Sequence, residues 1–490
     1  MLRKLIKGVA IVTVGLVALG AVLYQFYGLR ATLDGGGFPR LDFVVGGEQQ
    51  AAEIARHRET QRREAEATPA TASPVAAAGN ALVQAEQRVA SALESVAPTP
   101  EAIAPDAPYW TDFRGPRRDG HYRERPISTD WPSAGLTPMW KQPVGGGYAS
   151  FVIAAGRAFT IEQRGQQEVV AAYDVATGLE LWTSGWQALF SESLGGDGPR
   201  ATPTWAEGVV YALGGTGELR ALDDTKGRVI WQTNILDDNG ARNLEWGMAA
   251  SPLVVDDTLI VLPGGSNGRS VVAYDRRTGA RAWSALDDQQ AYSSPMLVTL
   301  AGVRQILVFS ATRLMGLSPG RGDVLWDYPW RTDFGINASQ PLLLGDDRVF
   351  LSTGYGTGAA VVEVSATDSR FSVREVWRNN RMKNSFTSSV LHEGFVYGLD
   401  ESILACMDAA TGELRWKGGR YGHGQVLLAN GHLIVLTEDG DLALVRAAPE
   451  RHEEIVRFPA LSGKTWNHPA IAGGYLLIRN LAEMAAFDLR

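Results

Sequence analysis

One short segment of this chain recurs and limits the folds that the sequence can adopt. It reads AAYDVATGLELW at residues 171–182, YDRRTGARAW at 274–283 and MDAATGELRW at 407–416. Aspartate, glycine and tryptophan keep a fixed spacing in these copies, and looser copies lie between them. A period of 40 to 50 residues is typical of repeat folds in which each unit is one small sheet. The closing tryptophans are 39 to 52 residues apart, and Phe458 continues their series: Trp140, Trp182, Trp231, Trp283, Trp326, Trp377 and Trp416.

A second pattern follows each closing aromatic residue. A small or polar residue precedes two β-rich runs that a turn with Gly or Asp joins, as in a hairpin. Eight copies occur, at 148–161, 200–213, 249–262, 292–309, 337–352, 386–399, 422–436 and 466–479. Each unit therefore has four strands, which indicates a β-propeller blade. The count is eight, or seven if a weak unit near 365–377 or 446–458 is misread.

The two ends of the repeat region complement each other. The chain stops at AAFDLR (485–490), a third strand without a fourth, and the missing strand is present in LTPMWKQPV (136–144). We therefore predict an all-β, eight-bladed propeller over 106–490, closed by pairing its N-terminal strand with its C-terminal blade. Closure of this kind leaves no open sheet edges.

The repeated residues suit a structural joint. Asp accepts hydrogen bonds from nearby amides, Gly supplies a positive φ, and the tryptophan packs between neighbouring blades while its N–H reaches a backbone acceptor. The predicted docking glycines are Gly178, Gly227, Gly279, Gly322 and Gly412.

The N-terminus has the pattern of a membrane segment. Arg3, Lys4 and Lys7 precede an uncharged run over 8–28 that is long enough to cross a bilayer. Positive charge before the run places that end in the cytoplasm, and therefore the rest of the chain in the periplasm of a bacterium. We expect residues 1–30 to be a single-pass inner-membrane anchor. A cleaved signal peptide is the alternative.

Residues 31–105 are rich in Ala, Pro and Glu, and we expect them to form a disordered linker. The charged stretch 48–67 could form a short exposed helix. Its alternative role is to bind a partner.

Composition excludes several classes of site. The net charge of -8, with both signs interspersed, argues against a nucleic-acid partner. A single cysteine, Cys406, allows no disulfide within the chain and no multi-cysteine metal site. The seven histidines lack zinc-ligand spacing, so we expect no metal site from them.

Ligand chemistry in a propeller usually lies on the loops that lead from one blade to the next, around the channel mouth. These loops bring polar and aromatic residues to one face, where they either form a ligand-binding funnel or pair with each other and water. The candidate funnel residues are Arg200, Glu245, Trp246, Arg331, Asp333, Asn337, Lys383, Asn384, His423, Lys464, Trp466, Asn467 and His468.

From residue 109 onward, the D-x-x-T-G-x-x-x-W repeat and the lead-in WTDFRGPRRDGHY (110–122) resemble the PQQ-binding-like, or quinoprotein alcohol dehydrogenase-like, propeller repeat proteins. The resemblance implies the fold and leaves the activity open. Its superfamily contains dehydrogenases that hold PQQ against Ca²⁺. It also contains a periplasmic lipoprotein of the outer-membrane β-barrel assembly machinery, which binds protein and has no cofactor.

Two functions follow from the resemblance. The first is a membrane-anchored periplasmic scaffold without catalysis or cofactor, which binds a protein or small ligand at the funnel. The alternative is a PQQ- and Ca²⁺-dependent alcohol or sugar dehydrogenase, with Glu245, Asn337, Asn384 and Asp333 as conjectural oxygen ligands. The vicinal cysteine pair of many soluble members is absent, since the chain has one cysteine.

Overall fold

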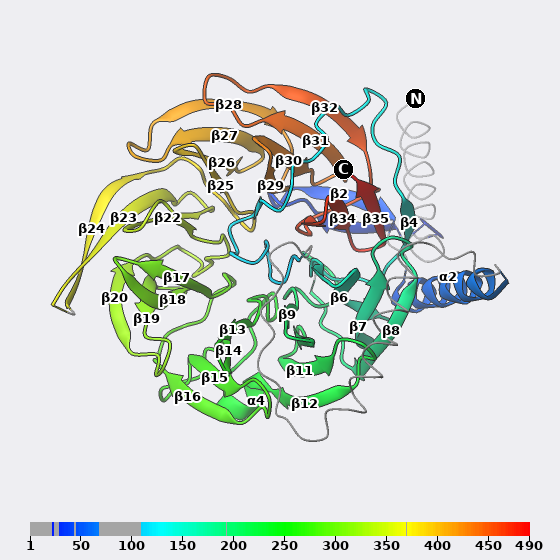
Figure 1. The fold of residues 1–490 in the computed structure, drawn as a ribbon, viewed down its shortest axis with the longest axis horizontal. Coiled ribbons are helices and arrows are strands. Elements are labelled where there is room, and N and C mark those ends of the chain that lie inside the picture. Colours follow the sequence, from blue (N-terminus) through cyan, green and yellow to red (C-terminus); the bar gives the residue numbers. More distant parts are fainter. Residues whose placement is uncertain (1–21, 24–28, 44–45, 68–108, 193, 369) are drawn as a thin grey trace, which may run out of the picture.

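Eight sheets, seven of four strands and one of five, form a closed ring around a central axis (Figure 1). The computed structural model describes residues 22–23, 29–43, 46–67, 109–192, 194–368 and 370–490. In seven of these sheets the chain runs outward through four consecutive antiparallel strands, and in the last it runs through three. The all-β, eight-bladed propeller predicted from the repeat is confirmed.

The strands of the first four complete blades, in chain order, are β5 (Val152–Ala154), β6 (Arg157–Arg164), β7 (Gln167–Asp174) and β8 (Glu180–Gln187); β9 (Thr204–Ala206), β10 (Val209–Leu213), β11 (Glu218–Asp223) and β12 (Val229–Asn234); β13 (Leu253–Val255), β14 (Thr258–Val261), β15 (Val271–Asp275) and β16 (Arg281–Ala285); and β17 (Met296–Leu300), β18 (Val303–Phe309), β19 (Arg313–Leu317) and β20 (Val324–Pro329).

The remaining blades contain β21 (Leu342–Leu343), β22 (Arg348–Thr353), β23 (Gly358–Thr367) and β24 (Arg370–Asn379); β25 (Val390–His392), β26 (Phe395–Asp400), β27 (Ile403–Asp408) and β28 (Leu414–Arg420); β29 (Gln425–Ala429), β30 (His432–Leu436), β31 (Asp441–Arg446) and β32 (Glu454–Pro459); and β33 (Ala470–Ala472), β34 (Tyr475–Arg479), β35 (Glu483–Asp488) and β4 (Trp140–Pro143). Outside these sets lie β1 (Leu29–Leu33), β2 (Pro39–Phe43), α2 (Gly47–Ala67), β3 (His121–Tyr122) and α4 (Ile235–Asn239).

The ring closes as the sequence predicts. Strand β4 pairs with β35 in antiparallel register, with Trp140 opposite Ala486 and Pro143 opposite Glu483. The last blade is thus completed by the first strand of the propeller, and no blade is left with three strands. Buried side chains of one blade pack against those of the next around the ring; for example, Phe159 and Val170 share a cluster with Val210 of the following blade.

The segment AAYDVATGLELW forms the turn between the third and fourth strands. Asp174 Oδ1 accepts hydrogen bonds from the backbone N–H and the hydroxyl of Thr177, both at 2.8 Å. Gly178 has a φ of 72° and donates its N–H to Asp174 O. A positive φ at this position favours glycine, because a side chain would crowd the backbone.

The tryptophan of one blade packs on the turn of the next. Trp182 Nε1 donates to Asp224 O at 2.9 Å, and its ring covers Gly227, where an added Cβ would lie 2.3 Å away. Corresponding pairs are Trp140 with Gly178, Trp231 with Gly279, Trp283 with Gly322 and Trp377 with Gly412.

Two blades with irregular turns modify this joint. Trp326 donates to Gln305 of its own blade instead, and the following β23–β24 turn has no glycine of this kind. Trp416 donates to Ala448 O in the following blade, where the turn also has no glycine.

Phe458 does not occupy the tryptophan position that the spacing predicts. In the other blades the tryptophan pairs with the last residue before a bulge in the third strand, as Trp416 does with Cys406. In the blade of Phe458 the residue at that point is Val456, opposite Leu444. The connection between β31 and β32 is longer than a T-G turn, so the aromatic residue is displaced by two positions.

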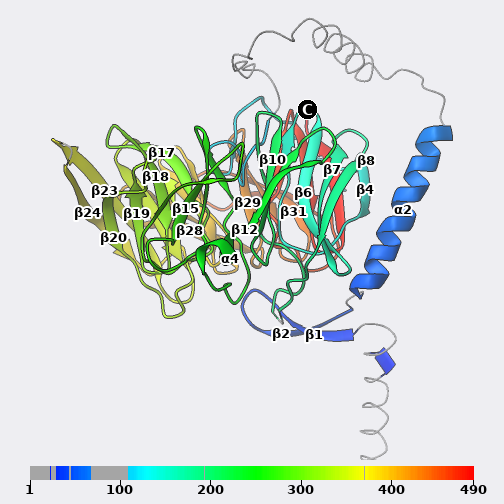
Figure 2. The same cartoon turned by 90° about the horizontal axis from the view of Figure 1, so that it is seen from below.

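The predicted disordered linker differs from the structure in its described parts, 31–43 and 46–67. These residues form the β1–β2 hairpin and helix α2, which runs along the outside of the ring (Figure 2). Ile54 of the helix is buried, and Arg58 reaches Gln142 Oε1 at 2.8 Å and Pro143 O at 2.9 Å. The helix is anchored mainly by polar side chains. It therefore lacks the apolar stripe that would have marked it as packed.

The other N-terminal predictions concern residues that are mostly not described. Within the described residues, no helix combines the length and apolarity needed to cross a bilayer. The predicted anchor over 8–28 lies outside them except for Val22 and Leu23, and residues 68–105 of the linker lie outside them entirely.

Candidate functional site

The funnel is lined by one residue from each blade at an equivalent place in the repeat. In seven blades this residue stands four positions before the first residue of the inner strand, and in the β29 blade it stands two before. A cavity of about 710 Å³ opens among these side chains and those of nearby loops. The eight residues, called the funnel ring below, are Tyr148, Arg200, Ala249, Tyr292, Ala338, Phe386, His423 and Trp466.

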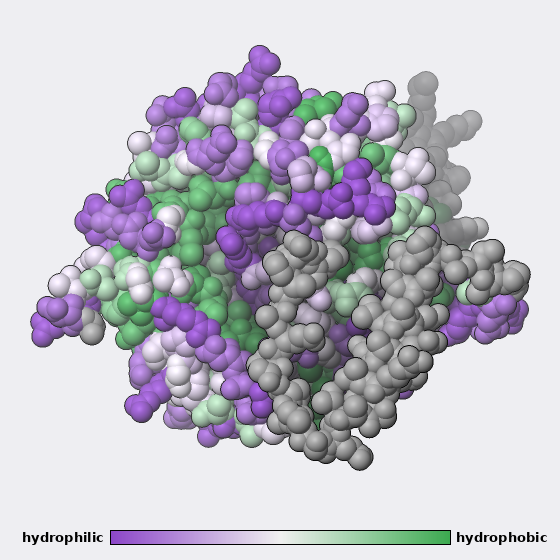
Figure 3. Space-filling view, viewed as in Figure 1, coloured by the Kyte–Doolittle hydropathy of each residue, from purple (hydrophilic) through white to green (hydrophobic). Residues whose placement is uncertain are grey.

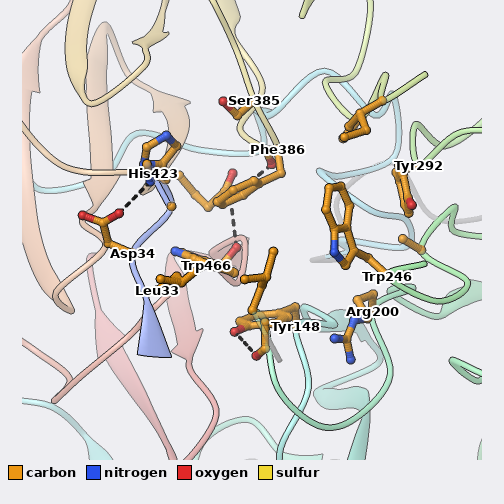
Figure 4. A pocket seen from close by; sticks show the side chains of 18 of the residues that line it. Leu33, Asp34, Tyr148, Arg200, Trp246, Tyr292, Ser385, Phe386, His423 and Trp466 are labelled. Atoms are coloured by element: carbon orange, nitrogen blue, oxygen red, sulfur yellow. Dashed lines mark hydrogen bonds between the residues drawn. The ribbon is translucent and has the colours of Figure 1, made fainter. Parts of the chain in front are cut away.

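Four rings of consecutive blades form a continuous aromatic arc (Figure 4). Phe386 stacks on His423 with ring centroids 5.4 Å apart and contacts Trp466 at 4.6 Å. Trp466 in turn stacks on Tyr148 at 5.1 Å. Such an arc offers a large apolar contact surface with polar atoms at its edges, which suits recognition of planar groups and polypeptide chains.

The other side of the funnel is less crowded. Tyr292 is flanked in the ring by Ala249 and Ala338, whose small side chains leave room. Trp246, from the loop between α4 and β13, lies beside Tyr292 with ring centroids 5.6 Å apart. Figure 4 shows this pair facing the arc across the cavity.

Glu438 supports the arc from the turn between β30 and β31. Its carboxylate accepts hydrogen bonds from the backbone N–H of His423 at 3.0 Å and from Trp466 Nε1 at 2.9 Å. Burial raises the pKa of Glu438, but the hydrogen bonds from His423, Trp466 and Gly35 outweigh burial and lower the pKa to about 2. The carboxylate is therefore charged at neutral pH and fixes two ring residues.

Arg200 carries a second buried charge. Its guanidinium donates to Glu192 Oε1 at 3.0 Å and to Gly196 O at 2.8 Å, and it lies over the ring of Tyr148. Burial lowers the pKa of Arg200, and the neighbouring Tyr148 hydroxyl and Glu192 carboxylate oppose that effect. The Glu192 carboxylate balances the charge locally.

The lead-in segment closes the far end of the channel. Arg114 and Arg118 are 1% and 2% exposed at the centre of the ring. Arg118 donates to Pro295 O at 2.8 Å and to Asp112 Oδ1 at 2.9 Å, and Arg114 donates to Ser389 O at 2.6 Å. The funnel is therefore a blind pocket. Figure 3 shows the face of the ring opposite the hairpin. On this face, hydrophilic residues project outward and hydrophobic residues are visible between them.

The structure brings five of the predicted funnel residues to the pocket wall: Arg200, Trp246, His423, Trp466 and His468. Three predicted asparagines are buried and hold loops together. Asn337 accepts from Thr353 Oγ1 at 2.8 Å, Asn384 accepts from Ser389 Oγ at 2.8 Å, and Asn467 donates to Ala149 O at 2.9 Å.

The other predicted residues lie around the rim. Lys383 Nζ pairs with Glu401 at 2.9 Å, and Lys464 Nζ donates to Leu194 O at 2.9 Å while it covers the ring of Trp466. Glu245, Arg331 and Asp333 are exposed and are not part of the pocket wall.

Several important residues were not predicted. Tyr148, Tyr292 and Phe386 open three of the eight hairpin segments recognised in the sequence, at the position that Arg200 and Trp466 occupy in their own segments. Aligning the eight hairpins by their inner strands identifies all members of the funnel ring. Glu438 carries no such signal, because it lies on a turn inside a blade.

The proposed calcium ligands do not come together. The side-chain oxygens of Asn337 and Asn384 accept hydrogen bonds from Thr353 and Ser389. Glu245 and Asp333 are exposed outside the pocket. Among the described residues, no group of three or more His, Cys, Asp or Glu side chains could hold a metal ion. Ca²⁺ requires several oxygen ligands around one point. The four residues therefore do not fit a calcium-held quinone.

The fold and the funnel define a class: eight-bladed propellers that are built on tryptophan-docking repeats and enclose a binding pocket. The family model described as outer membrane protein assembly factor BamB matches residues 166–418, slightly more than half of the chain. The chain belongs to that family.

Individual relatives are distant. The outer membrane protein assembly factor BamB of Bordetella pertussis is 22% identical over 311 residues, which are 61% of this chain and 72% of that protein. Among solved structures, BamB from Moraxella catarrhalis is 16% identical with a TM-score of 0.52, and the match covers 72% of this chain and 98% of that chain. A europium-containing methanol dehydrogenase is 13% identical with a TM-score of 0.59, over 79% of this chain and 98% of that chain. At these identities the structural likeness concerns the fold alone.

Proposed function

We propose that the protein is a periplasmic assembly scaffold that binds a protein partner in its funnel. The observation that carries the proposal is the funnel ring, in which one position of a structural repeat bears a different side chain in most blades. Residues that recur from blade to blade, such as the docking tryptophans, serve to join the blades. Residues that differ between blades and meet at the axis can recognise a specific ligand. Aromatic rings and arginine are the side chains in which protein-binding surfaces are enriched. Membership of a family described as assembly factors supports the same function.

The propeller is tethered to the inner membrane by residues 8–28. The basic residues before this apolar run and its length support a single-pass anchor with the propeller in the periplasm. Mass spectrometry of the protein extracted from membranes tests this point. The anchor requires an intact N-terminal segment, and a mature chain that begins after residue 20 would contradict it.

The dehydrogenase alternative is tested on the purified full chain. Dye-linked oxidation of alcohols and sugars is measured with and without added PQQ and Ca²⁺. We expect no PQQ-dependent turnover and no quenching of tryptophan fluorescence by PQQ. Turnover that requires PQQ and disappears in Trp466→Ala would replace the scaffold by an enzyme.

A further inference from the structure

The tip of the β1–β2 hairpin occupies the mouth of the funnel. Residues 33–38 contribute to the pocket wall, and Figure 4 shows Leu33 and Asp34 next to His423 and Trp466. The propeller residues they meet follow almost 400 positions later in the chain. The hairpin lies beneath the ring in Figure 2, across the funnel face. Part of the binding pocket is thus already filled by the chain's own N-terminal segment.

The turn at this tip is held by its own hydrogen bonds. The backbone N–H of Asp34 donates to Phe38 O, and Asp34 O accepts from the N–H of Gly37, each at 2.9 Å. Asp34 Oδ1 accepts from the N–H groups of Gly36 at 2.9 Å and Phe38 at 2.8 Å. Because these bonds are local, an Asp-Gly-Gly-Gly turn in any other polypeptide can form them too.

Two contacts fit this turn to the funnel. Gly35 donates its N–H to Glu438 Oε1 at 2.6 Å, on the same carboxylate that holds His423 and Trp466. Gly35 also lies directly against the imidazole, where an added Cβ would be 2.3 Å from His423 Cγ. The pocket therefore accepts a backbone N–H at a residue without a side chain.

Two further features of the tip contribute little to holding it. Phe38 is 71% exposed, so its ring contributes little burial. Arg40 pairs with Asp439 at 3.2 Å, but that carboxylate is 70% exposed, and an exposed ion pair contributes only about 0–1 kcal/mol. A turn held in this way can leave the funnel without disturbing the propeller.

We propose that the funnel is a receptor for a glycine-bearing polypeptide turn, and that the β1–β2 turn is its resident occupant, which a partner's turn displaces. This proposal rests on the proposed function, because it names the part of a protein partner that the funnel recognises. The partner's turn places a glycine N–H on Glu438 and its flanking side chains on the aromatic arc. The arrangement makes the scaffold self-blocked until a competing turn is present.

The test uses the full chain in detergent and the variant Gly35→Val. Gly35 does not have a φ in the left-handed region that favours glycine, and the three atoms nearest to an added Cβ all belong to His423, so a valine side chain collides with the imidazole. Gly46→Val is the matched control, because a side chain at Gly46 meets no atom within 4 Å and its φ is also not positive. The probe is a fluorescent synthetic peptide with the sequence of residues 32–41, TLDGGGFPRL.

We expect fluorescence anisotropy to show at least tenfold tighter peptide binding to Gly35→Val than to the wild type or Gly46→Val. The peptide with valine in place of its first glycine should not bind, and Glu438→Ala added to Gly35→Val should abolish binding. Hydrogen exchange should be at least tenfold faster over residues 32–43 in Gly35→Val alone. If the wild type and all variants bind the peptide equally, or if none of them binds it, the proposal that the funnel receives a polypeptide turn is wrong. The scaffold function is tested by a different result: PQQ-dependent turnover would contradict it whatever the outcome of the peptide experiment.

Discussion

At the scale of the residue, the repeat works through a contact between tryptophan and glycine. The ring of Trp182 lies where a side chain on Gly227 would stand, and its indole N–H is satisfied by Asp224 O of the next blade. The glycine is thus required twice, for its φ of 66° and for the space above it.

These two requirements can be separated by two substitutions. Gly208 has a φ of 81° but no atom within 4 Å of an added Cβ. Gly208→Ala should destabilise the protein by about 1 kcal/mol through the backbone alone. Gly227→Ala should lose a further 1–3 kcal/mol, roughly, from displacing Trp182. Urea denaturation of both variants checks this difference, and equal losses would show that the tryptophan does not depend on the glycine.

A buried carboxyl group makes stability depend on pH. Glu168 is fully buried; Gly215 N–H donates to Oε1, while Oε2 has no hydrogen-bond partner among the described residues. Burial raises the pKa of Glu168 to about 7. Because the pKa of this acid is higher in the folded than in the unfolded protein, the folded state keeps its proton to a higher pH. The free energy of unfolding therefore falls as pH rises from about 4.5 to 7.

Glu168→Gln should remove this pH dependence, because glutamine keeps the shape without the charge. From pH 5 to pH 8, this group should reduce the free energy of unfolding of the wild type by roughly 2 kcal/mol. The variant should lack that decrease. Urea denaturation at both pH values measures it, and parallel losses in the two proteins would assign the pH dependence to other groups.

At the scale of the element, helix α2 is attached to the ring by a buried arginine. Arg58 is 2% exposed, donates to Gln142 and Pro143, and lies over the ring of Tyr173 at 5.0 Å. Its Nε is 3.4 Å from Glu180 Oε2. Removing one member of a buried charged network leaves the partners uncompensated, at a cost of several kcal/mol.

Arg58→Ala should therefore release the helix from the propeller. Hydrogen exchange over residues 47–67 should be more than tenfold faster than in the wild type. Arg62→Ala is the matched control on the same helix, because the Arg62 side chain is 56% exposed and pairs only with Glu59 of α2 itself in the contacts described. Equal protection in both variants would mean that the other contacts of α2, such as those of Ile54 and Gln50, hold the helix without Arg58.

Elements differed in how far the sequence predicted them. Strand β4 was predictable, because the last blade lacks a fourth strand and the segment 136–144 before the first blade has the pattern of one. The docking of α2 was not, since it relies on polar contacts with residues far along the chain. The misplacement of Phe458 has a local cause: the turn before β32 is longer than in the other blades, and spacing alone cannot detect this.

At the scale of the whole molecule, the lead-in segment ties separate blades together at the axis. The guanidinium of Arg118 donates to Thr204, Pro252 and Pro295, which precede or begin the inner strands of three consecutive blades. The five donors of a guanidinium are spread over three nitrogens and reach carbonyls on different blades, whereas the three donors of an ammonium group lie on a single nitrogen.

Arg118→Lys should therefore destabilise the ring by about 3 kcal/mol, even though the charge is kept. Arg117→Lys, at the exposed neighbouring position, should change the free energy of unfolding by less than about 0.5 kcal/mol. Chemical denaturation of the two variants provides the comparison. A small effect at Arg118 would mean that water replaces its contacts.

The binding site could be predicted only in part. Residues on the loops between blades, such as Trp246 and Trp466, were found because such loops surround the channel in any propeller. Phe386 holds the same position of its repeat as Trp466 but was missed, because the equivalence of these positions appears only when the hairpins are aligned by their inner strands. The contact between Gly35 and Glu438 joins segments 403 positions apart, and no periodic pattern relates them.

The central claim is that the funnel ring is where this scaffold holds its protein partner. A photo-crosslinking amino acid at Tyr292 measures this directly in living cells, with the same amino acid at Val303 as the control. Val303 begins β18 of the same blade, beyond the inner strand, and therefore lies on the opposite face. Crosslinks to a specific envelope protein at Tyr292 and none at Val303 are the predicted result. Crosslinks at Val303 alone, or equal yields at both positions, would contradict it.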